Sequence, residues 1–115
     1  VSKISAVGLT VAGKKDEETF LIPIKEIFYF ESVDGKMFFC TENETYEAMA
    51  KLYKIEENLK NLRFSRISKT VIANLDKMLS IRKAENSRLT ATLVNQEKLI
   101  VSRQYVSEIK KKLGV

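Results

Sequence analysis

The sequence contains no histidine and a single cysteine, Cys40. Histidine is the commonest general base and the commonest metal ligand, so its absence argues against acid–base catalysis and against metal binding. One cysteine cannot form a disulfide within the chain, and without histidine it does not complete a structural zinc site. Because Cys40 ends the apolar run MFFC, we expect a buried core thiol in a reducing, cytoplasmic protein.

Long hydrophobic runs are also missing. The longest apolar stretch, residues 20–24, is interrupted by Pro23 and stopped by Lys25, whereas a membrane-spanning helix needs about 20 apolar residues. The first residues hold no apolar signal-peptide core, so we expect no membrane association and no secretion. Since Val1 is not an initiator methionine, we expect residues 1–115 to be one domain that lacks an upstream N-terminal region.

Motifs of catalysis are scarce as well. The four glycines are scattered over turn and strand positions, so the chain has no glycine-rich loop for a phosphate group. The carboxylate clusters at residues 16–18 and 56–57 stand in polar contexts and are expected to be solvated. Ser68 precedes Lys69, but nothing marks this serine as an activated nucleophile. We therefore expect no enzymatic activity, no small-molecule substrate and no cofactor.

Charge, in contrast, is plentiful and unevenly distributed. Residues 1–63 hold nine Lys/Arg and eleven Asp/Glu, whereas residues 64–115 hold eleven Lys/Arg and four Asp/Glu, within a total net charge of +5. A basic half on a compact domain is typical of a protein that binds a polyanion. The alternatives are an ordinary basic surface and a basic face that binds an acidic partner protein.

The first half of the chain alternates apolar runs with polar turns, which predicts β-strands. We expect strands at residues 4–12, 20–23, 27–33 and 36–41, with turns at residues 13–18, 24–26 and 42–44. Asp34-Gly35 is the strongest hairpin signal. From Thr45 the pattern fits either a strand or a helix; we favour a strand to about Met49 and a helix over residues 50–61, with its Met/Leu/Ile stripe facing the core.

The second half continues this pattern and ends in a helix. Residues 66–73 predict a strand-loop-strand or extended segment, followed by strands at residues 75–82, 88–93 and 98–101. Ser102 is expected to cap the last helix and Gly114 to end it. Its apolar face is formed by Tyr105, Val106, Ile109 and Leu113. Short strands, close turns and few helices predict a mostly-β domain without a helix-turn-helix.

Four cations lie at or beside a predicted turn or the start of the last helix: Lys36, Arg66, Lys69 and Arg103. Beside Arg103, the free N–H groups of a helix start and the Ser102 hydroxyl suit a phosphate oxygen. Arginine also reads a guanine edge through two parallel hydrogen bonds. RNA binding is disfavoured, because the aromatic residues lie in core-like strands and not on a stacking platform.

Four blocks of the sequence resemble the LytTR family of bacterial DNA-binding domains. The blocks are IKEIFYFES at residues 24–32, LYKIEENL at residues 52–59, FSRISKTVIANL at residues 64–75 and LIVSRQY at residues 99–105. They follow the family's order and cover nearly the whole chain. Residues 30–36 and those after Phe64 are most similar to the stand-alone regulators of the family.

The resemblance implies an elongated sandwich of small antiparallel sheets with one short mid-chain helix and a C-terminal helix. It implies sequence-specific binding of double-stranded DNA by loops that enter the major groove, within a bacterial transcription regulator that acts as a homodimer on repeated half-sites. Mapped onto this chain, the expected DNA-binding residues are Lys36, Met37, Arg66, Ser68, Lys69, Ser102, Arg103 and Gln104. Arg103 is expected to read a base, and Ser68 and Lys69 to hold phosphates.

The chain departs from the family pattern at four positions. Many members have histidine where Ser68 stands and arginine where Lys69 stands, and Thr70 and Ala73 replace a usual serine and valine. These differences bear on base preference more than on the fold.

Overall fold

Residues 9–115, which the computed structural model describes, form ten β-strands, two α-helices and three short 3-10 helices. The strands are β1 (Thr10–Lys15), β2 (Glu18–Pro23), β3 (Tyr29–Val33), β4 (Lys36–Cys40), β5 (Thr45–Ala48), β6 (Phe64–Arg66), β7 (Val71–Asn74), β8 (Met78–Lys83), β9 (Leu89–Leu93) and β10 (Lys98–Val101). The helices are α1 (Leu52–Leu59), α2 (Arg103–Leu113), η1 (Ile24–Glu26), η2 (Leu75–Lys77) and η3 (Glu85–Ser87). The prediction of a mostly-β domain is confirmed.

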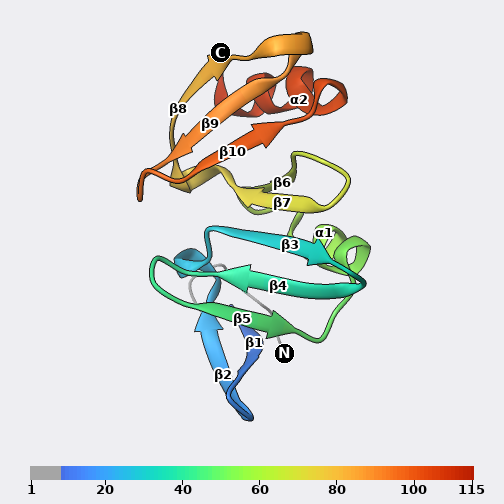
Figure 1. The fold of residues 1–115 in the computed structure, drawn as a ribbon, viewed down its shortest axis with the longest axis vertical. Helices are drawn as coiled ribbons and strands as arrows, with labels where there is room; N and C mark the ends of the chain where they lie inside the picture. Colours follow the sequence, from blue (N-terminus) through green and yellow to red (C-terminus); the bar gives the residue numbers. More distant parts are fainter. Residues whose placement is uncertain (1–8) are drawn as a thin grey trace.

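The strands form two antiparallel sheets that follow one another along the long axis of the molecule (Figure 1). The larger sheet has seven strands in the order β2-β1-β5-β4-β3-β7-β6, and the smaller has three in the order β10-β9-β8. The molecule measures 40 × 30 × 24 Å. The elongated arrangement of small antiparallel sheets that the family resemblance implies is therefore also confirmed.

The β1–β2 hairpin is longer than the sequence pattern predicts. Its turn consists of Asp16 and Glu17 alone, with φ of +53° and +67°. Two successive residues with positive φ match the twist of the flanking strands, as in short hairpin turns. The predicted turn over residues 13–18 is therefore wrong, because most of it belongs to the paired strands. Of the predicted strand at residues 4–12, positions 4–8 lie outside the described residues and Thr10–Ala12 lie in β1.

The Asp34-Gly35 hairpin is confirmed, with φ of +51° and +81° at the two positions. The ambiguous segment after it divides into β5 and α1, close to the favoured interpretation. Ile55 and Leu59 of α1 are buried as expected, but Met49 is 73% exposed. Met49 lies between the strand and the helix, so it follows the periodicity of neither element.

Strands β3 and β7 divide the interior into two hydrophobic clusters, because successive side chains of a strand point to opposite faces. Phe30 and Ile72 belong to the first cluster, which includes the buried residues of α1. Their neighbours Tyr29 and Ala73 belong to the second cluster, which the small sheet and α2 cover. These two strands therefore form a middle layer that is packed on both faces.

Helix α2 closes the second cluster. Ile109 is fully buried, and Tyr105, Val106 and Leu113 pack against the cluster, which confirms the predicted apolar face. Gly114 ends the helix with φ of +81°, a conformation that glycine adopts without steric cost.

Gly13 lies at the centre of the β1 pairing, where the chain has no room for a side chain. A Cβ at this position would lie 2.6 Å from a ring carbon of Phe39 and 2.6 Å from the Cβ of Tyr46. These two rings stack on each other with centroids 5.3 Å apart. The close approach of the aromatic pair to the β1 backbone therefore requires glycine here.

We predict that Gly13→Ala lowers the free energy of unfolding by about 1–3 kcal/mol, because the added methyl group overpacks the aromatic pair. Urea denaturation measures this change. Lys14→Ala, at an exposed position of the same strand, is the control and should change stability by less than about 0.5 kcal/mol. Equal stability of the Gly13→Ala and wild-type proteins would contradict the steric argument.

Candidate nucleic-acid interface

Three segments that are far apart in the sequence meet on one side of the molecule. They are the β3–β4 turn (residues 33–36), the β6–β7 loop (residues 67–70) and the start of α2 (residues 102–104), together termed the three tips. The N–H of Ser32, in β3 directly before the first tip, donates to the Thr70 carbonyl at 2.9 Å, and the Ser102 N–H donates to the Ile67 carbonyl at 2.8 Å. The β6–β7 loop is thus bonded to the segments on both sides of it.

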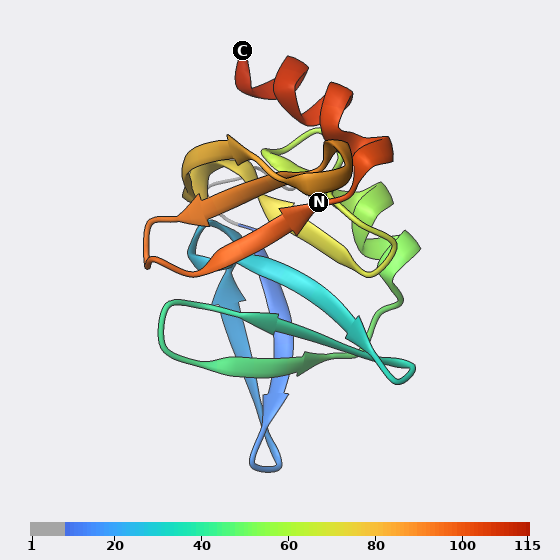
Figure 2. The ribbon, with the colours of Figure 1, turned by 45° about the horizontal axis from the view of Figure 1, so that its top comes forward.

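Figure 1 shows the three tips one after another along the right-hand side of the molecule, in the direction of the long axis. They remain on the same side when the molecule is turned by 45° (Figure 2). Lys69 and Arg103 therefore belong to neighbouring tips and not to opposite sides. A shared surface of this kind is a requirement of the DNA-binding hypothesis.

The β6–β7 loop is anchored by its first residue. Ile67 is 1% exposed and belongs to the second hydrophobic cluster, and its N–H donates to the Val71 carbonyl at 3.0 Å. The Ser68 hydroxyl accepts a hydrogen bond from the Thr70 N–H at 3.2 Å. Lys69 and Thr70 are exposed at the tip. The loop therefore has a buried base and an exposed cationic end.

Arg66 lies at the start of this loop, and its guanidinium is occupied within the protein. Its Nη2 and Nε donate to Oε1 of Glu56 at 2.8 and 3.3 Å, and its Nη1 donates to the Lys69 carbonyl at 2.7 Å. The Arg66 side chain is only 17% exposed. From the sequence, we expected Arg66 to be a free cation beside a turn and Glu56 to be a solvated carboxylate. Their pairing was not predicted.

At the third tip, Arg103 and Gln104 are exposed and Ser102 is half-buried. The predicted capping bond of Ser102 is wrong, because its side chain makes no capping hydrogen bond to α2. Ser102 is extended, with φ of −65° and ψ of 149°, and its carbonyl accepts from the Tyr105 N–H at 2.8 Å. The helix therefore begins without a side-chain cap, and the backbone bond to Ile67 holds its first residues in place.

The β3–β4 turn contributes one of its two predicted residues. Lys36 is exposed, whereas Met37 is 6% exposed and belongs to the first hydrophobic cluster. Alternation along β4 explains the difference, since neighbouring residues of a strand point to opposite faces. The Met37 side chain is therefore part of the core and is not available to a partner.

The three exposed cations of the tips remain free of acidic partners. The ion pairs found within residues 9–115 involve Lys15, Arg63, Arg66 and Lys112. Lys36, Lys69 and Arg103 take part in none of them. Their charge is thus available to an anionic partner on the side where the tips meet.

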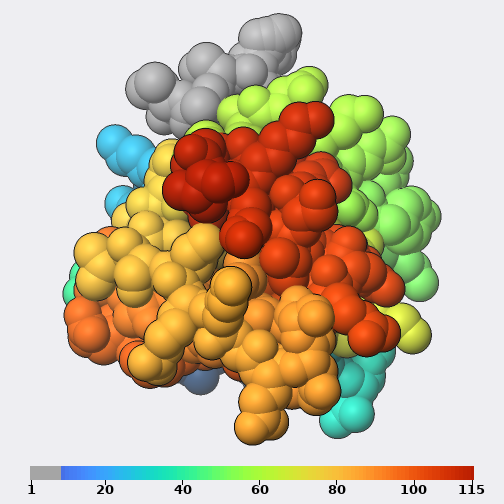
Figure 3. Space-filling model, turned by 90° about the horizontal axis from the view of Figure 1, so that it is seen from above, coloured from blue at the N-terminus to red at the C-terminus, as the bar shows by residue number. Residues whose placement is uncertain are grey.

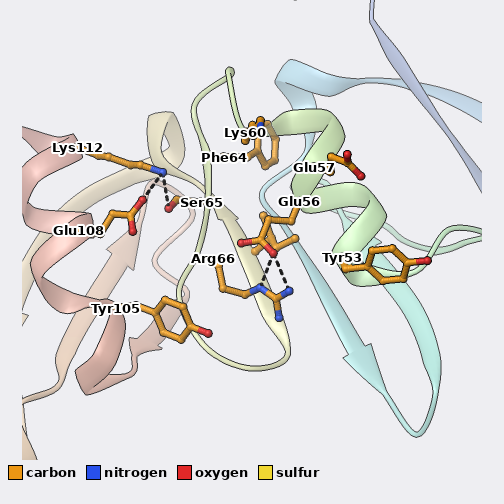
Figure 4. Close-up of a pocket in the computed structure, with 11 residues that line it drawn as sticks. Tyr53, Glu56, Glu57, Lys60, Phe64, Ser65, Arg66, Tyr105, Glu108 and Lys112 are labelled. Carbon is orange, nitrogen blue, oxygen red and sulfur yellow. Dashed lines mark hydrogen bonds and ion pairs between the residues drawn. The ribbon is translucent and has the colours of Figure 1, made fainter.

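Behind the tips, α1 and α2 lie side by side at the surface (Figure 3), and a groove of about 400 Å³ separates them along β6. Its walls carry both signs of charge, including the Arg66–Glu56 pair (Figure 4). On the α2 side, Lys112 donates to the Ser65 hydroxyl at 3.0 Å and pairs with Glu108 at 3.2 Å. No sequence pattern indicated this link between α2 and β6.

The comparison with known families decides the identity of this domain. Residues 17–114 match the LytTr DNA-binding domain family. The chain belongs to this family. The match takes in both α-helices and all three tips of the LytTr domain, and it confirms the resemblance stated from the sequence blocks.

Relatives and one solved structure agree with this assignment. The sensory transduction protein LytT of Bacillus cereus is 33% identical over 100 residues, which cover 87% of this chain and 41% of LytT. An HTH-type transcriptional regulator of Staphylococcus aureus is 26% identical over 106 residues, covering 92% of this chain and 71% of the regulator. A solved LytTr DNA-binding domain from Bacillus cereus is 25% identical, with a TM-score of 0.86 and coverage of 92% of this chain and 97% of that chain.

This LytTr domain spans about two-fifths of the length of the LytT relatives. Its two α-helices are separated by the five strands β6 to β10, so they do not form a helix-turn-helix. None of the helices found between residues 9 and 115 is long and apolar enough to cross a membrane. In the same part of the chain, no three Cys, Asp or Glu side chains gather as a possible metal site.

Cys40 is half-buried, which corrects the predicted core thiol. It lies opposite Tyr29 in the β3–β4 pairing, and the Tyr29 hydroxyl donates to the Glu97 carboxylate of the β9–β10 turn. Burial raises the pKa of the Cys40 thiol to about 11, although a hydrogen bond with Tyr29 acts in the opposite direction. Burial and the bond to Glu97 also hold the pKa of Tyr29 well above its ordinary value.

We predict that Cys40 reacts slowly with iodoacetamide. The thiolate is the nucleophile, and a pKa raised from 9.0 to about 11 lowers the thiolate fraction at pH 8 by roughly 100-fold. Mass spectrometry of native and urea-unfolded protein at pH 8 measures the two rates, and the native rate should rise as the pH approaches 11. Equal rates in the two states would show that the local environment does not protect the thiol.

Proposed function

We propose that this LytTr domain binds double-stranded DNA sequence-specifically by placing its three tips in the major groove, as part of a transcription regulator. The observation that carries the proposal is the pair of backbone hydrogen bonds that joins the tips through Ile67 and Thr70. These bonds connect the three exposed cations to one framework, so the cations can approach a duplex together. Membership in a DNA-binding family supports the same partner.

The dimensions of the protein and of the duplex are compatible. The major groove of B-DNA is about 12 Å wide and admits protein segments, and one helical turn is about 34–36 Å long. The tips follow one another along the 40 Å axis of the domain. A row of loops in this direction suits contacts along one face of a duplex.

The chemistry of the tips divides into phosphate binding and base reading. We assign Lys69, Ser68 and Lys36 to backbone phosphates; the Ser68 oxygen already accepts from Thr70, which leaves its O–H free to donate. We assign Arg103 to a base edge, because a guanidinium recognises guanine through two parallel bonds. Ser102 and Gln104 supply further polar groups beside it.

We further propose that the domain acts as a pair on repeated half-sites. Two copies bound one helical turn apart would contact the same face of the DNA. The LytT relatives are sensory transduction proteins of more than twice this length. In a protein of that kind, the domain would be the DNA-binding part and would respond to a signal received elsewhere.

We predict that DNA affinity falls steeply with salt, because each phosphate contact releases counterions and adds about −0.9 to the slope of log K against log salt concentration. Lys69→Ala should weaken binding to all duplexes about equally and reduce the magnitude of the slope by about 1. Fluorescence anisotropy with labelled duplexes at several salt concentrations measures both. Lys25→Ala, which removes an exposed cation of η1 outside the tips, is the control and should leave the slope unchanged.

We predict that Arg103→Ala weakens binding to the preferred duplex by about 1–3 kcal/mol and relaxes selectivity at one base pair. Selection from a random duplex library with wild-type protein defines the preferred site, and the same selection with the variant shows which position becomes degenerate. Unchanged selectivity would refute the role of Arg103. No preference among duplexes for the wild-type protein would refute specific DNA recognition and favour an acidic protein partner for the basic face.

A further inference from the structure

The Arg66 side chain links α1 to the tip of the β6–β7 loop. On one side it holds Glu56 in the second half of α1, and on the other it holds the Lys69 carbonyl at the tip of the β6–β7 loop. Figure 4 shows the Arg66–Glu56 pair at the edge of the groove between α1 and α2. The residue whose backbone is held in this way, Lys69, is the exposed cation of the central tip.

We propose that Arg66 and Glu56 are positioning residues that fix the shape of the β6–β7 loop for DNA binding, and that Arg66 does not itself contact the duplex. This inference rests on the proposed function, since the shape of the loop affects affinity only if the loop meets DNA. It assigns to α1 a role in recognition although α1 contributes none of the three tips.

The geometry suits a guanidinium and no other side chain. Arginine presents donors in a rigid planar fork, so it can hold a carboxylate with two nitrogens and a carbonyl with the third. Nε, Nη1 and Nη2 of Arg66 are each used in this way. A lysine keeps the charge but is a point donor on a flexible stem, and it cannot maintain all three bonds.

Direct phosphate binding by Arg66 has only two guanidinium N–H groups left to use, because three of the five already donate within the protein. Its side chain is 17% exposed, whereas that of Glu56 is 43% exposed. A phosphate therefore finds the guanidinium largely covered and already paired, while Lys69 is open beside it. The arrangement therefore favours separate roles, in which Arg66 holds the loop and Lys69 binds the phosphate.

The benefit to binding is preorganisation. A loop that is already held in the bound shape loses less conformational freedom on association, so more of the contact energy appears as affinity. The bond to the Lys69 carbonyl fixes the backbone at the tip, and the bond from Ser32 to Thr70 fixes the next residue. Loss of the first bond frees the Lys69 carbonyl, while the bonds at Ile67 and Thr70 remain.

The neighbouring residue Glu57 provides a matched control. It carries the same charge on the same helix and borders the same groove, but it takes part in none of the ion pairs found in the described part of the chain. Removing either carboxylate takes one negative charge away from the vicinity of the DNA. By electrostatics alone, Glu56→Gln and Glu57→Gln should therefore both leave affinity unchanged or raise it.

The test compares DNA affinity for Glu56→Gln, Glu57→Gln, Arg66→Lys and Arg66→Gln by fluorescence anisotropy across a salt series. We expect Glu56→Gln to weaken binding about 5- to 10-fold, a loss of about 1–1.4 kcal/mol, while Glu57→Gln binds as wild type or slightly more tightly. Arg66→Lys should weaken binding by a similar factor with an unchanged salt slope, because it keeps the charge and loses the fork. Thermal unfolding of each variant identifies any general loss of structure.

Hydrogen exchange of the free protein gives a second measurement that does not depend on DNA. The Thr70 amide belongs to the same peptide group as the Lys69 carbonyl and donates to Ser68, so it should exchange at least 5-fold faster in Glu56→Gln and Arg66→Lys than in wild type or Glu57→Gln. Amides of β9, at the centre of the small sheet, should not change. This readout separates a released loop from a loosened fold.

Two outcomes would overturn the inference. The first is unchanged exchange of the Thr70 amide in Glu56→Gln, which would show that the pair does not hold the loop. The second is tighter DNA binding by Glu56→Gln together with a salt slope reduced by about 1 in Arg66→Gln, which would make Arg66 a phosphate ligand. If the wild-type protein bound no duplex selectively, the proposed function would fail, and the exchange result would still decide whether Arg66 holds the loop.

Discussion

The structure depends on a middle layer of two strands, β3 and β7, whose two faces are both buried. Phe30 and Ile72 face the cluster under α1, while Tyr29 and Ala73 face the cluster under the small sheet. Because these residues alternate between the two clusters, a change of register by one residue would move each of them to the wrong cluster. The two strands are therefore fixed in position by both halves of the molecule at once. The loops that connect to this layer are therefore held in place where they begin and end.

Two of the three tips begin directly at this layer, and the third is bonded to it. The β3–β4 turn and the β6–β7 loop leave the same end of the paired strands β3 and β7, while the start of α2 reaches Ile67 through its backbone. Since Ile67 is itself buried in the second cluster, the loop is anchored below as well as on both sides. A LytTr domain can thus present loops with little freedom, which limits the entropy lost when a partner orders them.

The sequence located the candidate site but not the role of each residue in it. Short-range signals were reliable: Asp34-Gly35 forms its hairpin, the four blocks indicate the family, and the exposed positions of Lys36, Lys69 and Arg103 agree with the hypothesis drawn from them. Met37 was misplaced because the alternation of a strand decides which neighbour faces the core. The pairing of Arg66 was missed because its partner, Glu56, is ten residues away on another element, and no local pattern connects them.

The sequence by itself determined the mostly-β class, the order of most elements, the apolar face of α2 and the family, because each of these depends on residue spacing within one segment. Only the tertiary structure decided that the three tips share one side, that Gly13 is required by the Phe39–Tyr46 stack, and that Arg66 is paired inside the protein. The physical reason is that these interactions join residues that are far apart along the chain. Backbone bonds between loops, ring stacking and ion pairs between elements leave no local pattern in the sequence.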